Sequence, residues 1–216
     1  MRTTWTGIAA LTATMLLASP GGAVTVTNLG NVPSSWSSVD PSQTLALPPG
    51  SSWDAVNGPP STRMGSNIPL YRSPFDPSGT ASPGLPNWQT IQYWAVGPDN
   101  PVNPAYLNFT SDQTQLQFLW GSVDDYNHLY FYNNGSLVAG GDITGAMVAG
   151  AQMAAGASLV RITDVIFDQV RFFSDGINAF EFSNVAPAIP LPPALLLLFS
   201  ALVGLGLFSR QKQLAS

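Results

Sequence analysis

The segment from Ala105 to Ala186 constrains the fold more than any other part of the chain. It contains no proline, and Gly, Asn and Asp residues divide it into short apolar segments at roughly ten-residue intervals. Residues 114–120 alternate large apolar side chains with glutamines, as expected for a strand with one buried face. Asn and Gly accept positive φ, so Asn133-Asn134-Gly135 predicts a hairpin turn. Together these features predict an all-β fold, specifically an antiparallel, jelly-roll-like β-sandwich.

The expected strands of this segment are residues 106–110, 114–120, 128–132, 136–139, 159–162, 165–174 and 179–185. In the last of them, alternation places Phe180 and Phe182 inward and Glu181 outward. Residues 145–157 are rich in alanine and are the one helix-compatible stretch among these strands.

Residues 24–104 form a proline-rich, irregular first half. Fourteen prolines fall between Pro33 and Pro104, and proline removes a backbone donor from a sheet. Central strands are therefore disfavoured here, and Trp88–Val96 is the best candidate strand. The tryptophans of this half are costly to leave in water, so we expect edge strands and loops that pack against a sheet.

The N-terminus has the composition of a secretory signal. Arg2 precedes an apolar stretch, and small residues lead up to Ala23, which predicts a signal peptide over residues 1–23. The expected domain organisation is this signal peptide, an extracellular β-sandwich domain and a C-terminal sorting tail, at residues 1–23, 24–188 (with parts 24–104 and 105–185) and 189–216.

The C-terminal tail has three parts in a fixed order. A proline-rich knuckle comes first, formed by Pro190, Leu191, Pro192 and Pro193. The uncharged apolar run 194–208 predicts a transmembrane helix, although its length is below the roughly 20 residues that usually span a bilayer. Arg210 and Lys212 then favour a cytoplasmic C-terminus in a single-pass precursor.

This order of knuckle, apolar helix and basic end resembles the PEP-CTERM class of sorting signals, in its VPLPA variant. The resemblance is carried by Ile189-Pro190-Leu191-Pro192 and by Gly204-Leu205-Gly206-Leu207 ahead of Arg210. Ile189 stands where Val is usual, and Pro193 where Ala is usual. The resemblance implies an exosortase as partner, a membrane-embedded protease that cuts near the proline motif, and a destination at the cell envelope or outside the cell.

The middle of the chain is similar to a subgroup of exosortase-dependent surface proteins. The similar stretches are residues 118–127, 129–132 and 144–145, and residues 179–185 resemble the "AFE-DN" strand that precedes many such tails. Ser183 replaces the Asp that is usual in that strand. The resemblance implies an exported surface protein and does not imply a particular chemistry.

Composition excludes several classes of function. The chain has no cysteine, which excludes disulfides, thiol catalysis and cysteine-ligated metals. Between Val24 and Ala188 four arginines stand against eleven Asp and one Glu, a net charge of −8 (4 − 12). Nucleic acid is therefore not an expected partner, because neutralising phosphates requires clustered Lys and Arg.

The loop Asp124-Asp125-Tyr126-Asn127 is the main candidate for ligand chemistry. Carboxylate and amide oxygens suit Ca²⁺, and the expected metal ligands are Asp124, Asp125 and Asp142. No other cofactor is expected. The alternative is a turn in which Asp and Asn bond their own backbone.

Aromatic side chains near this loop suggest a second kind of site. Trp120, Tyr126, Tyr130 and Tyr132 either form a platform that stacks on sugar rings or pack in the core. Alternation places His128, Tyr130 and Tyr132 on one face. The expected ligand-binding residues are Trp120, Asp124, Asp125, Asn127 and Tyr130.

Catalysis is not expected. His128 is the only histidine and Glu181 the only glutamate, and no Gly-x-Ser-x-Gly motif positions a nucleophile. The chain is therefore interpreted as a non-enzymatic exported surface or matrix protein with a structural or adhesive role, in contact with the membrane through its tail and with exopolysaccharide as a candidate partner. The alternative is a carbohydrate- or calcium-binding surface module.

Overall fold

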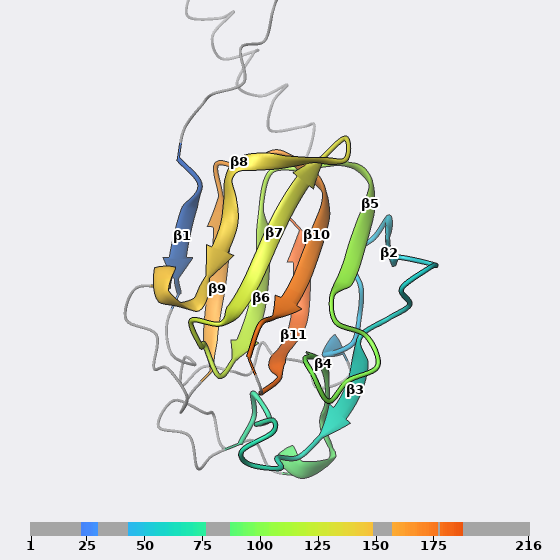
Figure 1. Cartoon of the computed structure of the whole chain (residues 1–216), viewed down its shortest axis with the longest axis vertical. Helices are drawn as coiled ribbons and strands as arrows, with labels where there is room; N and C mark the ends of the chain where they lie inside the picture. The colour runs from blue at the N-terminus through green and yellow to red at the C-terminus, as the bar shows by residue number, and fades with distance from the viewer. Residues whose placement is uncertain (1–22, 30–42, 77–86, 149–156, 177, 188–216) are drawn as a thin grey trace, which may run out of the picture.

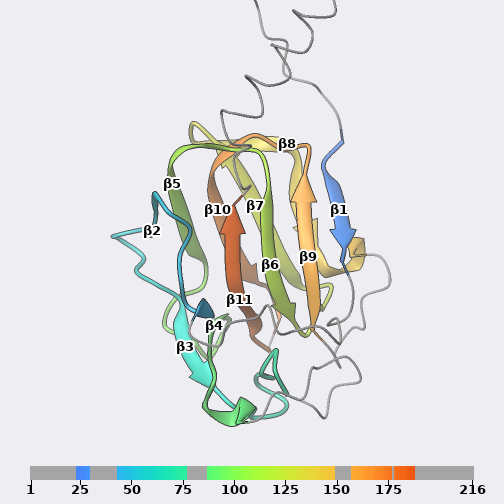
Figure 2. The ribbon, with the colours of Figure 1, turned by 180° about the vertical axis from the view of Figure 1, so that it is seen from behind.

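The computed structural model describes residues 23–29, 43–76, 87–148, 157–176 and 178–187. These residues form two antiparallel β-sheets that lie face to face (Figures 1 and 2). No α-helix occurs within the described ranges, which contain only short 3₁₀ turns such as η3 (Trp88–Thr90) and η4 (Gly145–Met147). The prediction of an all-β, antiparallel fold is confirmed.

The six-stranded sheet has the order β1 (Thr25–Asn28), β9 (Ser158–Thr163), β6 (Leu116–Gly121), β11 (Phe180–Pro187), β4 (Gln92–Val96) and β3 (Ser61–Met64). The five-stranded sheet has the order β2 (Ser51–Trp53), β5 (Ala105–Gln113), β10 (Phe167–Ser174), β7 (Asn127–Asn133) and β8 (Ser136–Thr144). Every pairing between neighbours is antiparallel.

The main core lies between the sheets and is rich in aromatic rings. The rings of Phe172 on β10 and Phe182 on β11 stack at 4.2 Å between centroids, with 9° between their planes. Trp120 stacks on Phe180 at 4.7 Å. All four side chains have no exposed surface. Burying one such side chain contributes about 1.5–3 kcal/mol. The Phe172–Phe182 contact joins the two sheets, whereas Trp120 and Phe180 lie on neighbouring strands of the six-stranded sheet.

The proline-rich half supplies three strands at sheet edges, as its composition predicts, and one interior strand, β4, which pairs with β3 and β11. β1, β2 and β3 are short strands of three or four residues, and each lies at the edge of a sheet. The expected strand Trp88–Val96 is shorter than predicted, because a 3₁₀ turn occupies its first three residues and β4 begins at Gln92.

A second apolar cluster lies on the outer face of the six-stranded sheet. It contains Phe75, Ile91, Tyr93, Ala95, Leu119, Ala157 and Ala179. Residues 65–76, called here the covering segment, close over this face: the Tyr93 hydroxyl donates to the Gly65 carbonyl at 2.6 Å, and the Ala179 N–H donates to the Leu70 carbonyl at 2.9 Å. The six-stranded sheet is therefore buried on both sides near β4, β6 and β11.

Several predictions fall on parts of the chain that the structure does not describe. The signal segment 1–22 and the tail 188–216, with the knuckle and the predicted transmembrane helix, lie outside the described residues. Of the helix-compatible stretch 145–157, only the turn at Gly145–Met147 and the following Val148, and at its end Ala157, are described. In the part of the chain that is described, no helix is long and apolar enough to cross a membrane.

Candidate functional site

Strand β7 presents alternate side chains to the core and to the outer face of the five-stranded sheet. Leu129 and Phe131 are fully buried, whereas His128, Tyr130 and Tyr132 are half-buried on the opposite face. The prediction that these three share a face is confirmed. Neighbouring strands add to the same surface, called here the aromatic face, which consists of Tyr106, His128, Tyr130, Tyr132, Arg171 and Phe173.

Arg171 lies at the centre of the aromatic face. It pairs with Tyr130 of β7 and with Tyr106 of β5 in the strand register. Its guanidinium carbon is 4.8 Å from the centroid of the Tyr130 ring and 4.7 Å from that of Phe173. Both distances are within the range of cation–π attraction, which fixes the guanidinium over the rings.

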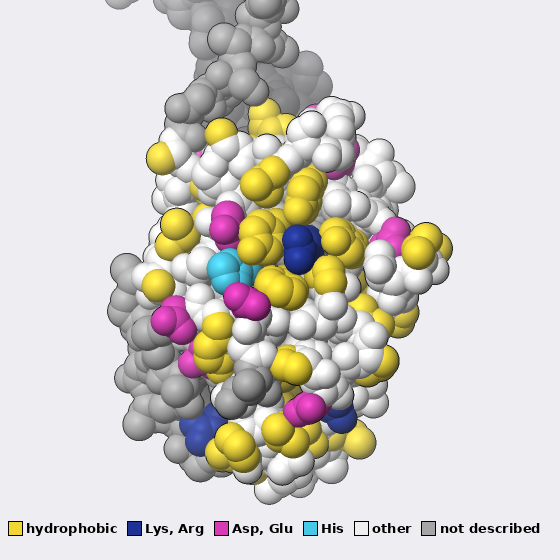
Figure 3. Space-filling view, in the orientation of Figure 1, with side chains coloured by type: hydrophobic (Ala, Val, Ile, Leu, Met, Phe, Trp, Pro, Cys, Tyr) yellow, Lys and Arg dark blue, Asp and Glu magenta, His cyan; other side chains and the backbone are white. Residues whose placement is uncertain are grey.

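Polar groups border these rings. The His128 ring stacks on Tyr130, with 5.5 Å between centroids and 2° between planes, and its Nδ1 is 3.0 Å from Oδ1 of Asp142. On the other side, Gln169 Nε2 donates to Asn108 Oδ1 at 2.7 Å. Figure 3 shows hydrophobic side chains gathered on this face around a basic side chain, with the histidine and acidic side chains beside them. The result is an apolar surface with hydrogen-bonding groups at its margin.

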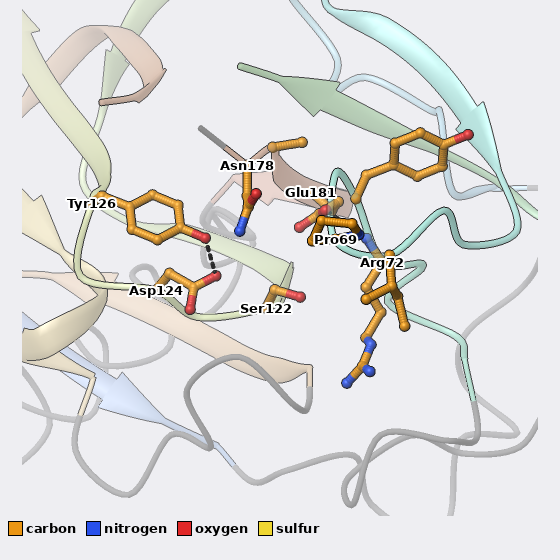
Figure 4. A pocket seen from close by; sticks show the side chains of 10 residues that line it. Pro69, Arg72, Ser122, Asp124, Tyr126, Asn178 and Glu181 are labelled. Carbon is orange, nitrogen blue, oxygen red and sulfur yellow. Dashed lines mark hydrogen bonds between the residues drawn. The ribbon is translucent and has the colours of Figure 1, made fainter. Parts of the chain in front are cut away.

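A second candidate site is a pocket of about 210 Å³ at the outer face of the six-stranded sheet (Figure 4). The covering segment contributes one wall, and the β6–β7 connection and the start of β11 contribute the others. Its lining residues are Ile68, Pro69, Tyr71, Arg72, Ser122, Asp124, Tyr126, Asn178, Ala179 and Glu181.

Glu181 is the most unusual residue of this pocket. Its side chain is 1% exposed, and Oε1 accepts the backbone N–H of Arg72 at 2.7 Å. Oε2 is buried and has no hydrogen-bond partner. Burial raises the pKa of Glu181 well above its usual range, and the nearby Asp124 carboxyl raises it further, whereas the Arg72 N–H lowers it.

Asp124 and Tyr126 face Glu181 across the pocket. The Tyr126 hydroxyl donates to Asp124 Oδ2 at 2.8 Å. Burial raises the pKa of Tyr126, and this hydrogen bond adds to the rise. Asn178 lies between them, with a buried Oδ1 that has no partner. Ser122 has a φ of 45°, an uncommon value for a residue with a side chain, and its hydroxyl points toward the pocket in Figure 4.

The structure separates the residues predicted to bind ligand. The prediction for Trp120 is wrong, because its ring is fully buried between the sheets and no ligand can stack on it. Asn127 is also fully buried, and its Nδ2 donates to the Ser122 carbonyl, as in the turn considered as the alternative. Asp125 is exposed. Only Tyr130 lies on the aromatic face.

The predicted calcium ligands are not brought together either. Asp124 lies in the pocket beside Tyr126, whereas Asp142 lies on β8 beside His128. Within the described ranges, no three His, Asp or Glu side chains gather where they could hold a metal ion. The set Asp124, Asp125 and Asp142 is therefore not assembled, since its members lie on different faces.

Sequence reasoning missed the neighbours that give each site its character. Arg171 and Phe173 on β10 belong to the aromatic face. The alternation of residues 165–174 could have predicted that both side chains point away from the core. The burial of Glu181 depends on the covering segment, which has no periodic pattern. Asn178 lies just before β11 and lines the same pocket, and no sequence pattern indicated this position.

Comparison with protein-family models, with curated proteins and with solved structures gave no match to this chain.

Proposed function

We propose that this chain is an exported surface protein that adheres to polysaccharide through its aromatic face. The observation that carries the proposal is the half-exposed set of rings around Arg171, with the guanidinium 4.8 Å from the ring of Tyr130. Such a set is unusual on a surface, because aromatic side chains are normally placed where they bury their area.

A sugar is the ligand class that fits this arrangement best. A pyranose ring has an apolar face of C–H groups, which stacks on aromatic rings, and an edge of hydroxyls, which needs donors and acceptors. The aromatic face offers rings at its centre and Asp142, Asn108 and Gln169 at its margin. The surface lies on a sheet rather than in a deep cavity, which suits an extended chain of sugars.

Other partners fit less well. Nucleic acid is disfavoured by the net charge of −8 (4 − 12) between Val24 and Ala188. The aromatic face holds no pair of carboxylates flanking a common space, as glycoside hydrolysis requires, so we propose binding rather than catalysis.

The cellular localisation of the protein is part of the same proposal. The signal-like segment 1–23 and the tail 189–216 support export, exosortase-dependent sorting and a transient membrane anchor. We further infer that the two facing sheets form a jelly-roll-like β-sandwich, because strands far apart in sequence, such as β1 and β9 or β4 and β11, are neighbours.

Affinity electrophoresis tests the binding. The full-length chain, purified in detergent, is run through gels that contain neutral or acidic polysaccharides. Retardation is expected in at least one gel and should be lost in Tyr130→Ala and Arg171→Ala. Arg161→Ala is the matched control, because Arg161 lies on β9 of the other sheet and bonds Gln117 there. Absence of retardation in all gels, or equal retardation of Tyr130→Ala, contradicts the proposal.

Intact-mass measurement tests the proposed export and processing of the tail. In the native host the mature species should begin near Val24 and end near Pro190, and it should be lost or retained in the membrane in a strain without exosortase. A complete tail in both strains would instead indicate an ordinary membrane anchor.

A further inference from the structure

We propose that the pocket beside Glu181 binds a calcium ion. The ligand set differs from the one expected from the sequence: it contains Glu181 and Asp124 and excludes Asp125 and Asp142. The inference is independent of the aromatic face, which lies on the outer side of the other sheet.

The first argument is an oxygen atom that the protein leaves without a partner. Glu181 is 1% exposed, lines the pocket and has one carboxylate oxygen, Oε2, with no hydrogen bond. A buried acceptor without a hydrogen-bond partner destabilises the folded state, and more strongly if it is charged. A bound cation would satisfy this oxygen, and the carboxylate would remain ionised.

The second argument is the chemistry of the surrounding groups. Asp124 supplies a second carboxylate, and Asn178, Ser122 and Tyr126 supply neutral oxygens in the same pocket. In Figure 4 these side chains converge on one space from both sides, whereas the Arg72 guanidinium points away from the Glu181 carboxyl. The lining thus concentrates negative charge and oxygen donors, with the Arg72 backbone N–H already bonded to Oε1.

Calcium is the metal that this set favours. Ca²⁺ accepts six to eight oxygen ligands in flexible geometry and completes its shell with water, so two carboxylates and neutral oxygens suffice. Zinc prefers His and Cys ligands, but the chain has no cysteine and its one histidine lies on β7, facing outward from the other sheet. Magnesium requires near-octahedral geometry, which a wide pocket of about 210 Å³ does not impose.

A cation here would connect three parts of the chain that are distant in sequence. Glu181 lies on β11, and Asp124 lies in the β6–β7 connection. Arg72, whose backbone N–H donates to Glu181, lies in the covering segment. Binding would therefore stabilise the packing of the covering segment on the six-stranded sheet, because a ligand that binds only the folded state raises its stability.

Terbium luminescence and thermal unfolding test the site on the full-length chain in detergent. Tb³⁺ replaces Ca²⁺ in oxygen sites and emits when a nearby tyrosine, here Tyr126, transfers its excitation. We expect Tb³⁺ emission that Ca²⁺ displaces, and a rise in the unfolding temperature with CaCl₂. Glu181→Gln keeps the shape and removes the charge, so the affinity for Ca²⁺ should fall by more than about tenfold.

Asp125→Asn is the matched control, since Asp125 is an exposed neighbour of Asp124 and lies outside the pocket lining. It should bind Ca²⁺ like the unaltered chain. Asp124→Asn provides a second test that does not depend on the folding of Glu181→Gln, and it should lower the affinity in the same way.

Three results would overturn the proposal. The first is the absence of any Ca²⁺ effect on the unaltered chain. The second is an equal effect of NaCl at matched ionic strength, which would indicate screening. The third is unchanged Ca²⁺ affinity in both Glu181→Gln and Asp124→Asn.

Discussion

The backbone N–H of Arg72 donates to Oε1 of Glu181 at 2.7 Å and so joins two residues 109 positions apart in the chain. This hydrogen bond attaches the covering segment to the strand beneath it. The Glu181 side chain is buried, so its removal takes the acceptor from the Arg72 N–H and also leaves an empty volume.

Glu181→Ala should therefore destabilise the protein by about 3 kcal/mol in calcium-free buffer. Glu181→Gln retains an oxygen that can accept the Arg72 N–H and should cost less than about 1 kcal/mol. Urea unfolding followed by tryptophan fluorescence measures both values. Equal destabilisation by the two variants would show that the charge, and not the hydrogen bond, is what matters.

Phe172 and Phe173 are adjacent on β10 but point to opposite faces. Phe172 is fully buried and stacks on Phe182, so Phe172→Ala should cost about 3–5 kcal/mol. Phe173 is half-buried on the aromatic face, so Phe173→Ala should cost about 1 kcal/mol or less and should instead weaken polysaccharide retention. Chemical unfolding and affinity electrophoresis of the same two variants check this. Equal losses of stability in the two variants would contradict the assignment of Phe172 to the core and Phe173 to the aromatic face.

Tyr93 predicts how the protein responds to alkali. Its hydroxyl donates to the Gly65 carbonyl at 2.6 Å, and burial, followed by the charge of Glu181, raises its pKa. Because the folded pKa lies above the unfolded value of about 10, the contribution of Tyr93 to stability is complete below that pH and is lost as the pH rises beyond it.

Tyr93→Phe should therefore lose about 1 kcal/mol at pH 7, from the missing hydrogen bond, but show a smaller decline in stability above about pH 10. Tyr126→Phe should likewise reduce the loss of stability above about pH 10, because burial also raises the pKa of Tyr126. Tyrosine absorbance and circular dichroism recorded along one pH series distinguish ionisation from unfolding. Ionisation of Tyr93 near pH 10 in a chain that stays folded would refute this account.

A substitution at Gly145 tests how closely the β6–β7 connection at Asp124 packs against this glycine. A Cβ atom at Gly145 would collide with the backbone carbonyl of Asp124, whereas one at Gly135, in the hairpin turn, would meet no atom. Gly145→Ala should therefore destabilise by about 2–3 kcal/mol and disturb the pocket. Gly135→Ala should cost only about 1 kcal/mol, because of its φ of 74°. Thermal unfolding of the two variants measures this difference.

Most of the strands could be predicted from the sequence, because alternation and turn residues are local signals. The expected strands 128–132 and 159–162 lie within β7 and β9 with one residue added at each end. Residues 136–139 were expected to stop at the glycine pair, but β8 continues to Thr144. Glycine weakens a strand without forbidding it, and pairing with β7 sustains this one.

The candidate sites were harder to predict because they depend on contacts between distant segments. Trp120 follows the alternation of β6, and that same pattern places it in the core rather than in a binding surface. The apolar runs Tyr93–Val96 and Phe118–Trp120 break the alternation, which indicates a sheet buried on both sides. That signal does not identify the covering segment, so the burial of Glu181 could not be foreseen.

The short strands of the proline-rich half have a consequence for contacts between copies of the chain. An exposed sheet edge offers unpaired N–H and C=O groups to which another molecule can add a strand. Here β1, β2 and β3 expose only three or four residues each, and the longer edge strand β8 is interrupted by an irregular register with β7 and by Gly140 at a φ of 70°. All four edges therefore resist strand addition, which opposes aggregation where many copies are crowded together.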